Sequence, residues 1–251
     1  MTNLFLFVMA LVAQKEQLTE TKSVLTPKIY SHLQKLVEED KPLAPIHEKA
    51  RKELAEVILK HYQAIEDPLA EKSQAKELAI ILICTGNSRR SMMGAAMGNA
   101  SAAYYGFNEV RFYSGGTIPS AFNSRSIKAL SEVGFQIEGS GEKAAAGVKG
   151  EENLYYWVNW GTGGKAKSLE FSKHYGDVKN PQKDFIALIV CDEEDCPKVE
   201  TSRKRILAPF DDPKVYDGKP KEAEKYAERR DDLGRLLLSS FSLAKEQLKP
   251  R

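Results

Sequence analysis

The stretch ILICTGNSRRS, residues 81–91, brings a cysteine and two arginines together at the end of an apolar run. Cys84 ends the run, and Arg90 and Ser91 lie six and seven residues after it. A cysteine at the start of a helix has a lowered thiol pKa, because the helix N-terminus stabilises the thiolate. An arginine presents paired N–H donors that match a tetrahedral oxyanion. The spacing therefore predicts a thiolate aimed at the phosphorus of a phosphate or the arsenic of an arsenate.

The residues after Cys84 are of the types that an oxyanion-binding loop requires. Gly86 lets the backbone approach a ligand closely, and Asn87 tolerates a left-handed backbone. The hydroxyl of Ser91 can donate a hydrogen bond to the thiolate. The alternative is that Cys84 is an ordinary buried thiol. We predict that the oxyanion is bound by Thr85, Gly86, Asn87, Ser88, Arg89, Arg90 and Ser91.

A thiolate enzyme of this kind also needs a proton donor for the leaving oxygen, normally a carboxylate. The late segment APFDDPKVYDG supplies Asp211 and Asp212, followed by Pro213. Proline restricts the residue before it, which stiffens this short loop. Asp-Pro is also a common turn sequence. We predict Asp212 as the general acid.

Strands and helices alternate along the second part of the chain. ELAIILIC, EVRFYSGG and DFIALIVC have the continuous or alternating apolar pattern of strands, and the segments between them are helical in pattern. This order predicts an α/β fold: a small doubly wound parallel four-stranded sheet with helices on both faces. Ligands bind at the carboxyl ends of strands in such sheets, which is where Cys84 is expected to lie.

The chain is predicted to have two parts. Residues 1–77 form an N-terminal helical extension, and residues 78–251 form the catalytic domain. Within the domain, an insertion over residues 138–182 includes NLYYWVNWGTGGKAKSLEFSKHY, which predicts an inserted β-hairpin. Its clustered aromatic residues favour a packed hairpin face over a substrate wall.

Residues 1–13, MTNLFLFVMALVA, leave the cellular location open. Their apolar run has the length of a signal-peptide core, which favours export. The segment has no Lys or Arg and no small residue three positions before a cut after Ala13. The alternative is a helix end packed on the protein, which would leave the chain in the cytoplasm.

The composition excludes several classes of function. A formal net charge of +2 without a dense basic stripe argues against a nucleic-acid surface. The four histidines lack metal-ligand spacing, and with three cysteines they make no zinc pattern, so we expect no metal or other cofactor. No segment is long and apolar enough for a membrane span.

Residues 78 to about 247 resemble the low-molecular-weight protein tyrosine phosphatase superfamily and, within it, the thioredoxin-coupled arsenate reductases. The resemblance rests on a strand followed by C-x5-R-S, on the Asp-Pro pair late in the chain, and on VRFYSGGT followed by AFNSRSIKALSEVGFQI. It implies that Cys84 is the nucleophile, Arg90 the oxyanion clamp and Asp212 the general acid.

The two other cysteines, Cys191 and Cys196, bear on which enzyme this is. In similar arsenate reductases, a second cysteine attacks the arsenic–thiol adduct and a third closes a disulfide that thioredoxin reduces. The resemblance assigns these roles to Cys191 and Cys196. Their spacer, DEED, is shorter than is usual in the family, and its acidic residues oppose thiolate formation. Arg89 also stands where many relatives have a further cysteine. The alternative is that Cys191 is a core thiol.

These observations predict a cysteine-thiolate enzyme that attacks a tetrahedral oxyanion. We favour arsenate reduction with thioredoxin as the partner, through a relay of Cys84, Cys191 and Cys196. The alternative is a tyrosine phosphatase that hydrolyses a phosphomonoester through a cysteinyl-phosphate. A third possibility is an inactive phosphate- or redox-sensing module.

Overall fold

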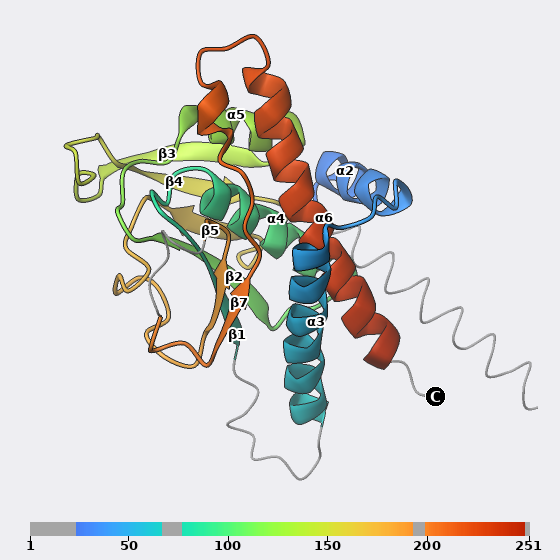
Figure 1. The fold of residues 1–251 in the computed structure, drawn as a ribbon. Coiled ribbons are helices and arrows are strands. Elements are labelled where there is room, and N and C mark those ends of the chain that lie inside the picture. Colours follow the sequence, from blue (N-terminus) through green and yellow to red (C-terminus); the bar gives the residue numbers. More distant parts are fainter. Residues whose placement is uncertain (1–23, 67–76, 193–198, 249–251) are drawn as a thin grey trace, which may run out of the picture.

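The computed structural model describes residues 24–66, 77–192 and 199–248 (Figure 1). A four-stranded sheet with the strand order β2-β1-β6-β7 lies at its centre. All neighbouring strands of this sheet are parallel. The parallel α/β fold predicted from the alternating pattern is therefore confirmed. The first thirteen residues, with their signal-peptide-like pattern, lie outside the described residues.

β1 (Leu78–Cys84) is the strand that carries the predicted nucleophile, and all seven of its residues are buried. It lies between β2 (Val110–Gly116) and β6 (Ile186–Ile189), and β7 (Lys204–Leu207) forms the edge beyond β6. A strand covered on both faces buries every side chain, which explains the unbroken apolar run LAIILIC.

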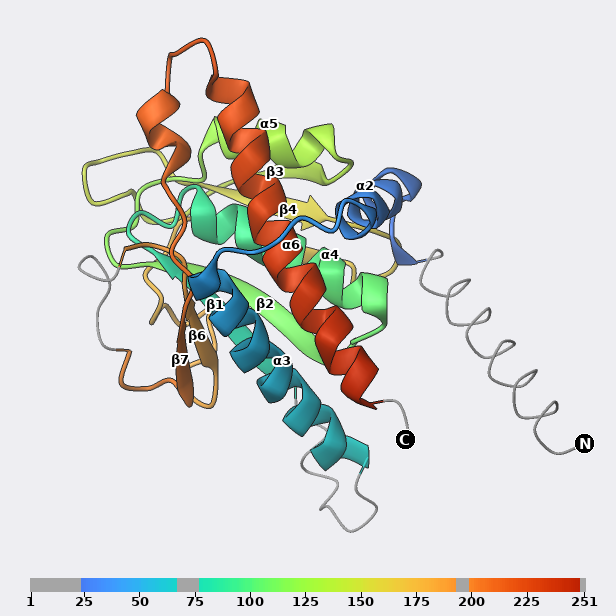
Figure 2. The same ribbon diagram turned by 45° about the vertical axis from the view of Figure 1, so that its right-hand side comes forward.

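The helix α4 (Arg90–Tyr105) follows β1 after a short loop and packs against β1 and β2. Its small residues allow a close approach to the sheet: a Cβ atom on Gly98 would lie 2.5 Å from the Phe112 ring. The long helix α6 (Glu222–Leu248) crosses α4, as both ribbon views show (Figures 1 and 2). The short helix α5 (Ser124–Glu132) contacts α6 as well.

Two helices, α2 (Pro27–Glu38) and α3 (Pro45–Glu66), form the described part of the N-terminal extension. Both pack against α6, and α3 also runs beside β7 (Figure 2). The fully buried side chains of Leu33, Leu54 and Ile58 belong to the same hydrophobic core as β1. The division of the chain at residue 77 stays a prediction, but the two parts share one core.

The predicted hairpin consists of β4 (Leu154–Asn159) and β5 (Lys167–Glu170), which pair antiparallel. A third strand, β3 (Gln136–Lys143), pairs with β4, so the inserted unit is a three-stranded sheet. The polar, glycine-containing sequence QIEGSGEK gives β3 no apolar pattern, which is why sequence reasoning missed it.

Trp160 and Tyr156 of the hairpin pack against the protein, whereas Trp157 is 38% exposed. Trp160 is buried under the guanidinium of Arg111, and Tyr156 meets the Phe122 ring edge-on at 5.7 Å between centroids. This agrees with the packed face favoured from the sequence. Among the described residues, no helix has the length and apolar character needed to cross a membrane.

The close approach of α4 to the sheet yields a test of the fold. Gly98→Ala adds a methyl group where the Phe112 ring already lies, and overpacking of this kind costs about 1–3 kcal/mol. We expect the free energy of unfolding in urea to fall, although alanine favours a helix over glycine by about 1 kcal/mol. Gly164→Ala is the matched control, because a Cβ atom there meets nothing within 4 Å. An unchanged or raised stability of Gly98→Ala would contradict the packing described here.

Candidate active site

Cys84 lies at the carboxyl end of β1, and its side chain is buried. Its Sγ atom is 3.1 Å from the hydroxyl oxygen of Ser91 at the start of α4. That oxygen also accepts a hydrogen bond of 2.8 Å from the side-chain amide of Asn87. Since Asn87 supplies the donor to Ser91, the hydroxyl proton of Ser91 is available to the sulfur. The contact agrees with the predicted hydrogen bond, in which Ser91 donates to an ionised Cys84.

Asn87 shapes the loop between β1 and α4. Its φ of 40° is left-handed, as expected from its residue type, and it is fully buried. Its side-chain oxygen accepts a 2.8 Å hydrogen bond from the backbone N–H of Lys173. Gly116 lies against the loop, and a Cβ atom there would come within 2.6 Å of both Asn87 N and Thr85 O. Only glycine fits at the end of β2.

The carbonyl oxygens of the loop bond to neighbouring segments. Thr85 O accepts hydrogen bonds from the backbone N–H groups of Thr117 and Ile118, at 2.9 and 2.8 Å. Gly86 O accepts from Ser120 N and Ser172 Oγ, at 3.1 and 3.0 Å. The first N–H groups of α4 have no partner within the helix, and its dipole is positive at this end. Carbonyls bonded to other segments and free amides at a helix start are the features that an anion-binding loop requires.

Arg90 joins this loop to the segment that follows β7. Its guanidinium is almost fully buried and donates hydrogen bonds to Phe210 O at 2.9 Å and to Asp212 Oδ2 at 3.1 Å. The second oxygen of Asp212 caps the 3-10 helix η3 (Pro213–Tyr216) by accepting from Lys214 N at 3.0 Å. The predicted clamp and the predicted acid are thus in contact.

The structure also separates Asp212 from its neighbour Asp211. The side chain of Asp211 is 97% exposed, and its ion pair with Arg229 is 3.5 Å long. Asp212 is 33% exposed and bonded to Arg90. The residue before the proline is therefore the one placed at the site.

The side chain of Arg89 is hydrogen-bonded within a second polar cluster. Its guanidinium donates to Tyr226 Oη at 2.6 Å and to Asp217 Oδ2 at 2.8 Å, and Tyr226 donates to the other oxygen of Asp217 at 2.6 Å. Burial alone would raise the pKa of Asp217, but the bond from Tyr226 and the charge of Arg89 lower it below its usual value. Arg89 therefore ties the loop to α6, and its predicted contribution to oxyanion binding rests on its backbone.

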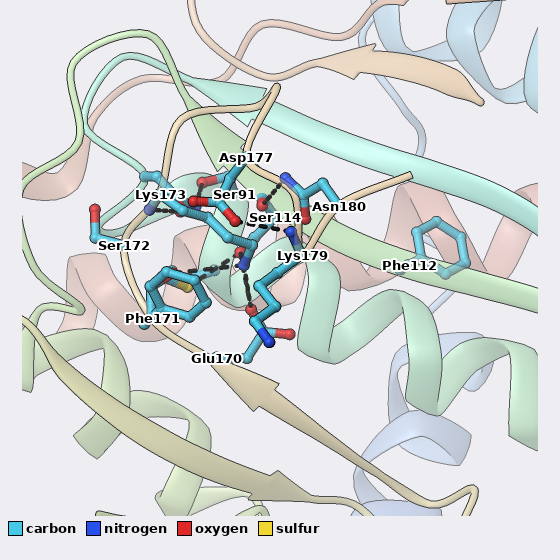
Figure 3. Close-up of polar contacts among 12 residues, drawn as sticks. Ser91, Phe112, Ser114, Glu170, Phe171, Ser172, Lys173, Asp177, Lys179 and Asn180 are labelled. Atoms are coloured by element: carbon cyan, nitrogen blue, oxygen red, sulfur yellow. Dashed lines mark hydrogen bonds and ion pairs between the residues drawn. The ribbon is translucent and has the colours of Figure 1, made fainter. Parts of the chain in front are cut away.

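The inserted sheet supplies two residues that sequence reasoning missed, Ser172 and Lys173. The hydroxyl of Ser172 donates to Gly86 O, and the backbone N–H of Lys173 donates to the side-chain oxygen of Asn87. The Lys173 side chain is only 4% exposed, and its Nζ lies 3.5 Å from Glu170 Oε2 (Figure 3). Ser114 of β2 donates to the same Glu170 oxygen at 2.9 Å. A buried Lys–Glu pair needs such additional bonds, and here it fixes the segment that holds the loop.

Cys191 lies two residues beyond the end of β6 and is buried. Its Sγ atom is 3.8 Å from the carbonyl oxygen of Ile83, the residue before Cys84, and it is disulfide-bonded. It thus shares the carboxyl edge of the sheet with the predicted nucleophile. Cys196, the third cysteine of the predicted relay, lies outside the described residues.

Comparisons with known proteins find a sequence match that includes the loop after β1. Residues 79–152, less than a third of the chain, match the sequence model of the family described as low molecular weight phosphotyrosine protein phosphatase. No curated protein matches the chain in sequence.

Several solved structures are similar in fold. A low molecular weight phosphotyrosine phosphatase from Vibrio cholerae O395 is 14% identical, with a TM-score of 0.41 over 68% of this chain and 99% of its own. The YwlE arginine phosphatase is 18% identical, with a TM-score of 0.39 over 69% and 98%. A low molecular weight protein tyrosine phosphatase from T. tengcongensis is 16% identical, with a TM-score of 0.40 over 68% and 100%.

The matched segment contains β1, the loop from Cys84 to Ser91, α4 and β2. The predicted resemblance to the low-molecular-weight phosphatase superfamily is confirmed over this segment, whereas the finer resemblance to arsenate reductases is not shown by these comparisons. Over residues 79–152 the chain is similar in sequence to the low molecular weight phosphotyrosine protein phosphatases.

Proposed function

We propose that the protein hydrolyses phosphomonoesters, with aryl phosphates such as phosphotyrosine as the substrate class. The proposal rests on the positions of three groups that come from three segments of the chain. Cys84 Sγ lies 3.1 Å from Ser91 Oγ, and Arg90, the residue before Ser91, bonds to Asp212 at 3.1 Å. The residues predicted as nucleophile, clamp and acid thus lie at one edge of the sheet, which supports the proposal.

In the first step the thiolate of Cys84 attacks the phosphorus of the ester. An S–P bond forms while the bond from phosphorus to the ester oxygen breaks, and Asp212 gives its proton to the departing oxygen. Arg90 and the N–H groups at the start of α4 hold the oxygens on which negative charge is carried. The hydroxyl of Ser91 stabilises the thiolate before attack and when it departs.

In the second step water attacks the cysteinyl-phosphate. Asp212, now ionised, takes a proton from the water while the S–P bond breaks. Inorganic phosphate leaves, and the thiolate of Cys84 and the protonated Asp212 are restored. The cycle balances without a metal or a redox partner, so it needs only groups of this chain.

Apolar side chains near the site support an aromatic alcohol as the leaving group. Ile118, whose N–H bonds to Thr85 O, is 50% exposed, and Val215, three residues after Asp212, is 59% exposed. Exposed aliphatic side chains beside a phosphate-binding loop favour a flat apolar ring over a sugar or a short alcohol.

Arsenate reduction is the second candidate function, and the place of Cys191 favours it. In that reaction Cys84 would displace a hydroxyl of arsenate and form an S–As bond. Attack by Cys191 on the sulfur of Cys84 would then release arsenite, with the two electrons of the S–As bond reducing the arsenic. Cys196 would attack Cys191 and free Cys84, and thioredoxin would reduce the resulting disulfide.

The two functions differ in which cysteines they require. For phosphomonoester hydrolysis, Cys84→Ser should lower kcat for 4-nitrophenyl phosphate by at least about 10³-fold, whereas Cys191→Ser and Cys196→Ser should retain activity. The assay pairs this ester with arsenate plus reduced thioredoxin. Arsenite release that is lost in all three variants would support arsenate reduction. Hydrolysis of 4-nitrophenyl phosphate that is unaffected by Cys84→Ser would contradict both proposals.

The general acid can be tested through the leaving group. Asp212→Asn removes the proton donor, so kcat/KM for phenyl phosphate should fall by about 10²–10⁴-fold. The loss should be smaller for 4-nitrophenyl phosphate, because nitrophenolate leaves without a proton. Asp211→Asn is the matched control, since its side chain is 97% exposed. Equal losses of kcat/KM for the two esters, or a larger loss in Asp211→Asn than in Asp212→Asn, would show that another residue is the general acid.

A further inference from the structure

The amino end of α3 contacts the segment that carries the predicted acid. His47, in the first turn of α3, has its ring Nε2 2.7 Å from the carbonyl oxygen of Pro209. A carbonyl oxygen only accepts hydrogen bonds, so Nε2 carries a proton and donates. The imidazole also stacks on the Phe210 ring, with centroids 4.1 Å apart and planes 18° apart. One side chain of the N-terminal extension thus holds two successive residues.

The residues that His47 holds are linked directly to the active site. Phe210 O accepts from Arg90 at 2.9 Å, and Asp212, two residues further, accepts from the same guanidinium at 3.1 Å. Phe210 N donates to Val190 O at 3.2 Å, which ties the segment to the end of β6. A shift at Phe210 would therefore move both the clamp and the acid.

The segment that carries Phe210 and Asp212 has no regular secondary structure to fix its backbone. Residues 208–212 lie between β7 and η3 and belong to no helix or strand of their own. Besides its bond to Val190, Phe210 is covered by the Arg229 guanidinium at 5.5 Å and by the His47 ring. An aromatic stack and a hydrogen bond from a helix restrict such a segment at its backbone, which sets the direction of the side chains that follow.

We infer that His47 is a positioning residue for catalysis, through which the N-terminal helices hold Arg90 and Asp212 in their working geometry. The inference rests on the proposed phosphatase activity, because it assigns His47 no contact with the substrate. It gives the extension a role at the active site: α3 completes the support of the acid-bearing segment.

The kinetic test compares leaving groups. Displacing Asp212 weakens proton donation, so His47→Ala should lower kcat/KM for phenyl phosphate about 10-fold and for 4-nitrophenyl phosphate by less than about 3-fold. His47→Leu keeps an apolar contact with Phe210 but cannot donate, and should show the same split. His47→Gln carries an amide donor and should recover to within about 2-fold of the unchanged protein.

His61→Ala is the matched control, since it removes a histidine from the far end of the same helix, where the ring meets Tyr62 at 5.8 Å. This variant should change kcat/KM for the two esters equally or not at all. Equal losses for both esters in His47→Ala and His47→Leu, or no rescue by His47→Gln, would show that His47 supports the fold alone and overturn the inference.

Hydrogen exchange separates this inference from the proposed function. In His47→Ala the amide of Phe210 should exchange at least about 5-fold faster, while the amide of Val190, bonded to Ile83 O at 2.9 Å, should be unchanged. If the full-length protein hydrolyses neither ester, the proposed function fails, and this measurement still reports on His47. Unchanged exchange at Phe210 would refute the positioning role even in an active enzyme.

Discussion

The candidate site depends on hydrogen bonds that hold the carbonyl oxygens of Thr85 and Gly86 against neighbouring segments, so that they need not face an oxyanion. A peptide loop can receive an oxyanion only if its carbonyls face elsewhere, because each carries negative charge. The segment after β2 and the inserted sheet supply the donors. Gly116 leaves room for the close approach, and Asn87 adopts the left-handed backbone that turns the chain.

Long-range contacts give a role to two additions to the α/β fold, the N-terminal helices and the sheet inserted between β2 and β6. The inserted sheet brings Ser172 and Lys173 to the loop from one direction, anchored by the buried Lys173–Glu170 pair. The N-terminal helices bring His47 to the acid-bearing segment from another. Both additions lie far from Cys84 in sequence, and both end in contacts with the backbone. Such contacts fix positions without adding chemistry, which is how supporting residues maintain the geometry of reacting groups.

The sequence alone was sufficient to predict the structure wherever local interactions determine it. The apolar run before Cys84 predicts β1, and the glycine and asparagine that follow predict the loop conformation. Asp212 was predicted as the acid because proton donation requires a carboxylate and because a family resemblance indicates one late in the chain. Its contact with Arg90 is a fact of tertiary structure alone. Lys173 and His47 carry no local signal, since a lysine or a histidine on an amphipathic segment is ordinarily a surface residue. β3 was missed because its pattern is polar, and strand pairing with β4 decided its structure.

The proposed mechanism requires transfer of the phosphoryl group to the Sγ atom of Cys84. Rapid acid quench of the protein during turnover of 4-nitrophenyl phosphate, followed by mass spectrometry of the peptides, tests it directly. The proposed mechanism predicts one phosphoryl group on the peptide that contains Cys84, and none on that peptide in Cys84→Ala. Turnover with the phosphoryl group on another residue, or turnover in Cys84→Ala, would contradict it.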